Sequence, residues 1–207
     1  MGFVLTVDQR DSSSTPDRVD HMLAKLAHVH TRLPFERTAG DEFQGLLADP
    51  LSVVDAILDL VRDGTWHIGL GAGPVAEPLP PSTRAARGPA FELARSAVEA
   101  AKRRPQHLAV HGADAAAAAQ ADAVLTLLAA VIQRRSPAAW QAIDLDDAGL
   151  TSTQAATKLG ISRQAVGQRL AVGLRSQELA VRPVISELLG RAEGRSSGAT
   201  PRPAPAR

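Results

Sequence analysis

The sequence predicts an α+β protein in which a sheet domain is followed by an all-helical domain. Three observations carry this prediction. Over residues 1–112, short apolar and β-branched runs alternate with amphipathic helical patterns. The composition then shifts to alanine, with five in a row at 115–119. Short helical patterns resume near residue 136 and end before a stretch rich in Gly, Pro, Ser and Arg at 191–207, which we expect to be a disordered basic tail.

The first half of the sheet domain is a strand, a helix and a hairpin. FVLTVD at 3–8 indicates a strand, and apolar residues at helical spacing over 19–29 indicate a helix. Two short strands flank a turn at Gly40-Asp41. Pro50 then opens a second helix, and Gly64 is placed to end it.

The second half supplies two more strands and a helix. WHIGLGAGPV is a glycine-rich strand, a third helix covers about 90–104, and HLAVHG is a last strand. The resulting order β-α-β-β-α-β-α-β contains the split-βαβ pattern of ferredoxin-like folds. It predicts a mixed or antiparallel sheet with helices packed on one face.

Length and composition exclude several classes of protein. The 207 residues allow one large domain or two small ones, and not a barrel enzyme with a separate cofactor domain. Cysteine is absent, which removes disulfides, thiol nucleophiles and cysteine-bound metals and agrees with a reducing compartment. The N-terminus shows no basic leader, and no apolar run reaches the ~18–20 residues of a membrane span. We therefore expect a cytoplasmic protein without a membrane partner.

Charge is distributed unevenly. Residues 1–150 carry 14 Lys/Arg and 19 Asp/Glu, whereas residues 151–207 carry 9 and 3, so the net charges are −5 and +6. This asymmetry points to an acidic body and a C-terminal part that meets a polyanion, although a solvated basic tail explains the charge as well.

Residues 113–135 form a connecting helix with an apolar stripe at Val124, Leu127, Leu128 and Val131. Two interpretations stay open: the stripe packs on the first domain, or it forms the seam of a homodimer. Ser136 then caps a new helix with Pro137 at its first position, so a second domain is expected over 136–190.

The segment LTSTQAATKLGISRQAVGQRLAVGLR has the features of a helix-turn-helix. Thr151 or Ser152 caps a short helix, Gly160 supplies the turn, and Ser162 caps a second helix at 162–173. A polar and basic face at the start of such a helix can reach base edges in the major groove, while other basic residues meet phosphates. The residues expected to contact DNA are Lys158, Ser162, Arg163, Gln164, Gln168, Arg169 and Arg175, with Arg182 as a further phosphate contact.

Over about residues 136–190, this segment resembles the helix-turn-helix domains of bacterial regulators, including MarR-type proteins and region 4 of sigma factors. It departs from a winged helix, because ELAVRPVISELLG reads as helix and leaves no strand pair for a wing. The resemblance implies double-stranded DNA as partner and a homodimer as reader. An ordinary helical hairpin with a basic surface is the alternative.

Carboxylates fall at corresponding ends of the first strand and the hairpin. Asp8 ends the strand, and Asp41 and Glu42 lie at the hairpin tip. In a split-βαβ fold these positions come together, so they are candidate ligands of a Mg²⁺ ion shared with a nucleotide. A solvated turn and a strand-end cap are the structural alternatives.

The segments VDQRDSSS, AGDEF, IGLGAGPV and GPAFELARSA resemble, in that order, palm-type nucleotidyl cyclase domains. AGDEF is similar to the GGDEF signature, and the whole layout is similar to the SatD family, whose GDEFQGLL segment recurs at 40–47. The resemblance implies metal binding by Asp8, Asp41 and Glu42 with Asp11 as a helper. It implies contacts to a purine nucleotide by Gly40, Gly71, Gly73, Gly88 and Arg95, and Arg84 and Arg87 are further candidates for phosphate.

These observations together predict a sequence-specific transcriptional regulator whose cyclase-like domain senses a nucleotide or mediates dimerisation. A Mg²⁺-dependent nucleotide-processing enzyme, a cyclase or nucleotidyl transferase directed to DNA by its helix-turn-helix, is the alternative.

Overall fold

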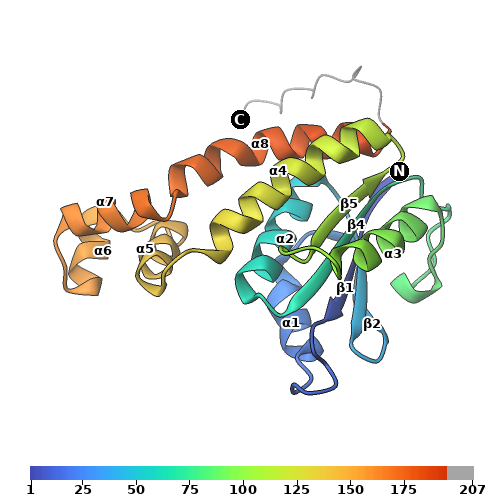
Figure 1. Ribbon diagram of the computed structural model, residues 1–207, viewed down its shortest axis with the longest axis horizontal. Helices are drawn as coiled ribbons and strands as arrows, with labels where there is room; N and C mark the ends of the chain where they lie inside the picture. The colour runs from blue at the N-terminus through green and yellow to red at the C-terminus, as the bar shows by residue number, and fades with distance from the viewer. Residues whose placement is uncertain (195–207) are drawn as a thin grey trace, which may run out of the picture.

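The computed structural model describes residues 1–194, which form a sheet domain with an elongated helical extension (Figure 1). Most of the segment expected to be a disordered tail lies outside the described residues. Its first residues do not fit that expectation, because the last helix runs to Ala192 and Glu193 is fully buried.

The sheet has five strands in the order β2-β3-β1-β4-β5. Their bounds are β1 Gly2–Gln9, β2 Thr31–Ala39, β3 Glu42–Leu47, β4 Trp66–Gly73 and β5 Leu108–Gly112. Neighbours are antiparallel except for β4 and β5, which are parallel. The predicted strands and the turn at Gly40-Asp41 are all present, and the α+β class with a mixed sheet is confirmed.

Helices cover both faces of the sheet, so the expectation that they pack on one face was wrong. The short helix α1 (Val19–Lys25), the 3-10 turn η1 (Leu26–His28) and α2 (Pro50–Asp63) bury Met22, Leu26 and Ile57 against one face. Helix α3 (Pro89–Ala101) lies on the other face (Figure 1). Gly64 ends α2 in the left-handed conformation with φ 78°, as its type predicts.

Two glycines of β4 allow α3 to approach closely. A Cβ atom on Gly71 would lie 2.1 Å from the backbone oxygen of Ala90, and one on Gly69 would lie 2.2 Å from the backbone nitrogen of Val98. The face of α3 that packs on the strand carries small side chains: its buried residues are Ala90, Ala94, Ala97, Val98 and Ala101. The glycine-rich strand is therefore a helix-packing surface.

Helix α4 (Ala115–Gln133) and helix α8 (Arg175–Ala192) run side by side from the sheet domain toward the extension (Figure 1). Ile185, Leu188, Leu189 and Ala192 of α8 belong to the same core as the sheet. The last helix of the expected second domain at 136–190 therefore packs on the first domain. Among the described residues, only α4 is long and apolar enough to cross a membrane, and 39% of its apolar window is buried, with contacts to α8 and β5.

The remaining helices form a small lobe: α5 (Pro137–Asp147), α6 (Ser152–Leu159) and α7 (Arg163–Val172). The side chains of Ser136, Thr151 and Ser162 cap them as the sequence predicts. Their shared core consists of Ala142, Leu145, Ala155, Ala156 and Val166, flanked by Leu150, Leu159, Ile161 and Leu170.

Ion pairs join the lobe to the rest of the molecule. Arg62 of α2 binds both carboxylate oxygens of Asp144, at 2.5 and 2.8 Å, and its guanidinium lies 4.0 Å from the centre of the Trp140 ring. Arg135, at the end of α4, lies 2.7 Å from Glu178 of α8 and donates from Nε to the carbonyl oxygen of Gly173 at 2.8 Å. The lobe therefore has a defined orientation on the sheet domain.

Candidate functional site

The outer face of α7 is an exposed polar surface of the lobe. Arg163, Gln164 and Gln168 are exposed, and Arg163 and Gln164 occupy the first turn. Ser162 uses its hydroxyl to accept a hydrogen bond from the backbone N–H of Ala165, at 3.1 Å. Arg169 is half-buried and donates to the side-chain oxygen of Gln141 at 3.3 Å. The helix therefore offers one arginine and two glutamines to a partner.

Electrostatics favour an anionic partner for this face. Residues 151–174 contain Lys158, Arg163 and Arg169 and no acidic residue. The acidic residues of α5 are compensated by arginines from outside the lobe, because Asp144 pairs with Arg62 and the other two pair with Arg175. Lys158 is exposed in the last turn of α6.

Arg175 and Arg182 do not belong to this surface, which corrects the sequence-based expectation for both. Arg175 is only 8% exposed and forms ion pairs with Asp146, Asp147 and Glu178. Arg182 binds Glu178 and Asp55, the latter at 2.8 Å. Both guanidinium groups connect α8 to its neighbours.

The predicted metal carboxylates come close in the backbone and still form no ligand set. Asp8 pairs with Glu42 across β1 and β3, and Asp41 follows in the hairpin turn. The Glu42 carboxylate accepts a hydrogen bond from the Thr38 hydroxyl at 2.5 Å. Within residues 1–194, no group of three or more His, Cys, Asp or Glu side chains could hold a metal ion.

A lysine occupies the place where a cation was expected. The Lys102 ammonium, at the end of α3, lies 3.6 Å from the Asp8 carboxylate and 2.8 Å from that of Glu99. Burial raises the pKa of Asp8, Lys102 lowers it, and the charges of Asp41 and Glu42 raise it again. These residues do not fit a Mg²⁺ centre, because the Lys102 ammonium pairs with Asp8 and the Thr38 hydroxyl occupies the Glu42 carboxylate.

The predicted nucleotide-binding glycines have separate structural tasks. The backbone of α3 occupies the space where a side chain of Gly71 would lie. A Cβ atom on Gly73 would make ordinary contacts of 3.4 and 3.5 Å to Leu93 and Ala113. Gly40, with φ 54°, forms the hairpin tip, where its carbonyl accepts from Arg37 at 2.7 Å. Gly88 precedes α3 with φ 132°, and it lines a pocket.

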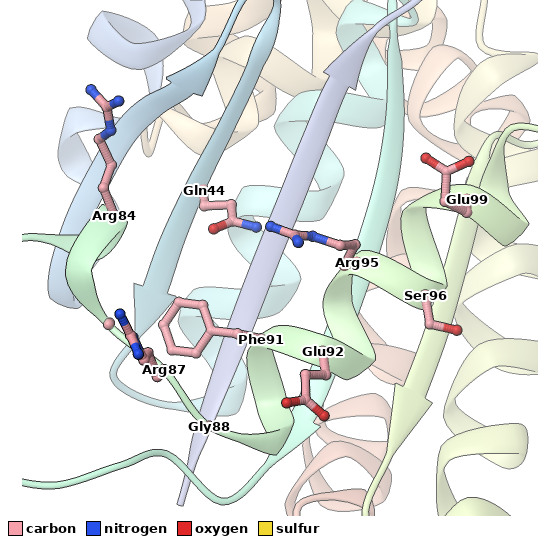
Figure 2. A pocket seen from close by; sticks show the side chains of 10 residues that line it. Gln44, Arg84, Arg87, Gly88, Phe91, Glu92, Arg95, Ser96 and Glu99 are labelled. Carbon is pink, nitrogen blue, oxygen red and sulfur yellow. The ribbon is translucent and has the colours of Figure 1, made fainter.

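That pocket, of about 510 Å³, lies between α3, the 3-10 turn η2 (Thr83–Ala85) and β3 (Figure 2). It contains the predicted Gly88 and Arg95 and two residues that sequence reasoning missed, Gln44 and Phe91. A polar residue between Phe43 and Leu46 in a buried strand was the available signal for Gln44. The full lining is Gln44, Arg84, Ala86, Arg87, Gly88, Phe91, Glu92, Arg95, Ser96 and Glu99.

Comparisons of this chain with family models, with curated proteins and with solved structures find no significant match.

Proposed function

We propose that this protein is a sequence-specific DNA-binding transcriptional regulator and that α6 and α7 are its helix-turn-helix. The observation that carries the proposal is the pairing of α6 and α7 through a left-handed Gly160, with φ 66°, which leaves Arg163, Gln164 and Gln168 exposed. Arginine and glutamine are the side chains that read guanine and adenine edges in the major groove.

In this proposal α7 is the recognition helix. Its N-terminal residues reach base edges, while Lys158 and Arg169 contact the flanking phosphates. The capping of α7 by Ser162 leaves further backbone N–H groups of its first turn directed at the DNA backbone. A partner of this kind is consistent with the expected cytoplasmic location.

The sheet domain is proposed to be ferredoxin-like, with β5 added beside the four-stranded unit. The order β2-β3-β1-β4, with every neighbour antiparallel, supports this interpretation. The similarity to cyclase palm domains and to the SatD family remains a proposal about ancestry. We do not propose the alternative Mg²⁺-dependent reaction, because Asp8, Asp41 and Glu42 form no metal-ligand set.

The proposed reader is a homodimer that pairs through α4 and α8. Val124, Leu127, Leu128 and Val131 line an apolar groove together with Leu174 and Val181. Leu127 is 68% exposed at the edge of this groove, and a contiguous exposed apolar patch is typical of an association surface. A second copy is the occupant proposed here, because it would bring two α7 helices to one DNA site with half-sites about one turn apart.

A binding selection on genomic fragments at about 150 mM salt tests the proposal, because this salt suppresses nonspecific phosphate contacts. The expected result is enrichment of one palindromic motif. Arg163→Ala or Gln164→Ala should then relax preference at particular base pairs by about 1–3 kcal/mol. Lys158→Ala should weaken all sequences alike.

Arg103→Ala is the matched control, because Arg103 is exposed in the sheet domain and this substitution removes the same charge as Arg163→Ala. It should leave the motif and its affinity unchanged. Failure to enrich any motif, or equal losses for Arg103→Ala and Arg163→Ala, contradicts sequence-specific recognition by α7.

A further inference from the structure

The pocket beside α3 has a polar floor inside an otherwise apolar layer. Gln44 is 6% exposed and Thr6 is fully buried, and the Gln44 amide nitrogen donates to the Thr6 hydroxyl at 2.8 Å. The neighbours on the same side of the sheet, Val4 and Leu46, are apolar and fully buried. Burying an amide costs free energy that an apolar residue would not, whereas a few polar groups in a pocket floor are what orients a ligand.

Positive groups surround this floor. In Figure 2 the Arg95 side chain extends from α3 over β1 toward Gln44, and Arg87 lies beside the ring of Phe91. Arg84 points away along the rim. Within residues 1–194, the ion pairs involve none of these three arginines. Their guanidinium groups are therefore available to an external anion.

The two carboxylates of the pocket do not neutralise those arginines. Glu99 forms its ion pair with Lys102 at 2.8 Å, and this bond lowers the pKa of Glu99. The Glu92 side chain points away from Gln44 and Arg95 (Figure 2). Arg95 therefore leaves an uncompensated positive charge beside Gln44, and Arg87 adds another on the far side of the Phe91 ring (Figure 2).

We propose that this pocket binds a phosphorylated small molecule with a ring. Arg95 holds the phosphate, because a planar guanidinium donates two parallel hydrogen bonds to such an anion, and Arg87 adds positive charge on the other side of Phe91. Phe91 gives the ring an apolar face, and Gln44 offers both a donor and an acceptor to its edge. The volume of about 510 Å³ is in the range of small-molecule sites.

This site differs from the carboxylate site that the sequence suggested. Its anion-binding groups come from α3 and the segment before it, and none of Asp8, Asp41 and Glu42 lines it. The inference is independent of DNA binding, because its site and its measurement concern the sheet domain alone. A nucleotide and a sugar phosphate share the required chemistry.

Isothermal titration of the full chain at constant salt tests the proposal with adenosine monophosphate, ribose 5-phosphate and inorganic phosphate as probes. We expect saturable binding of at least one ester. Arg95→Gln should weaken it about tenfold or more, as expected for the loss of charge-assisted hydrogen bonds. Arg103→Gln removes the same charge from an exposed position outside the pocket and should change the affinity less than about twofold.

A second variant separates the two sources of phosphate. Phe91→Leu should reduce the affinity for adenosine monophosphate more than that for ribose 5-phosphate if a base packs on the ring, which assigns a nucleotide. Equal affinity for both esters assigns a sugar phosphate. No saturable binding of either ester, or equal effects of Arg95→Gln and Arg103→Gln in proteins that melt like the parent, would overturn the proposal.

Discussion

Replacing Gly71 by alanine distinguishes a packing role from a ligand-binding role for the glycine-rich strand. Gly71 lies in β4 directly beneath α3, and the added methyl group would meet the backbone oxygen of Ala90 at 2.1 Å and the backbone nitrogen of Ala94 at 2.4 Å. Both obstacles are main-chain atoms of a helix, so no rotamer change relieves the overlap. The helix must move away from the sheet.

The size of the effect follows from these distances. Ordinary carbon contacts begin near 3.4 Å, so α3 has to shift by more than 1 Å at this point. Overpacking of a well-packed core costs about 1–3 kcal/mol, and a backbone obstacle places Gly71→Ala at the upper end. For a chain of this size, about 3 kcal/mol lowers the melting temperature by roughly 6–12 °C.

Thermal unfolding followed by circular dichroism measures this difference, and Gly73→Ala is the matched control. A methyl group on Gly73 would make contacts of 3.4 and 3.5 Å to side chains, so this variant should melt within about 2 °C of the parent. If Gly71→Ala melts like the parent, or if both variants lose the same stability, the packing explanation for the glycines is wrong.

Two further predictions concern association and pH. Leu127→Glu places a charge in the proposed dimer seam at a position that is 68% exposed, so sedimentation should show monomers that keep the parent's circular dichroism spectrum. A parent protein that is already monomeric at the same concentration would refute the seam. His67 has its pKa lowered to about 4 by burial first and then by His107, Arg10 and Lys102, so the native state resists a proton that the unfolded state accepts near pH 6.5. The free energy of unfolding should therefore fall by about 1 kcal/mol, after allowance for solvent screening, as the pH drops from about 6.5 toward 4. His67→Gln should flatten this part of the profile of melting temperature against pH. Identical profiles for both proteins would show that other groups are responsible.

Much of the local structure follows from the sequence, because it depends on neighbours a few residues away. Ser136 and Ser162 cap their helices through hydrogen bonds to backbone groups three residues later. Gly64 and Gly160 adopt left-handed conformations that favour glycine. These signals are sufficient for the order of the strands and helices, for the hairpin turn, and for the α6–α7 pair whose outer face is the candidate DNA-reading surface.

Only the tertiary structure decided which polar residues are available for function. Arg175 has the sequence signature of a basic contact, and its burial beside Asp146 and Glu178 depends on α8 folding back on the sheet domain. The Lys102 ammonium reaches Asp8 because α3 crosses the sheet face, over 90 positions along the chain from β1. Such pairings are set by how helices pack on a sheet, which local propensity does not encode.

The phosphate-binding proposal shows the same division. The resemblance to cyclase domains singled out Gly88 and Arg95, and the proline-rich loop singled out Arg84 and Arg87 as candidates for phosphate. Gln44 and Phe91 became part of a site only when β3 and α3 met across the sheet. The sequence determines which polar and aromatic residues are present, and long-range packing determines which of them line the same pocket.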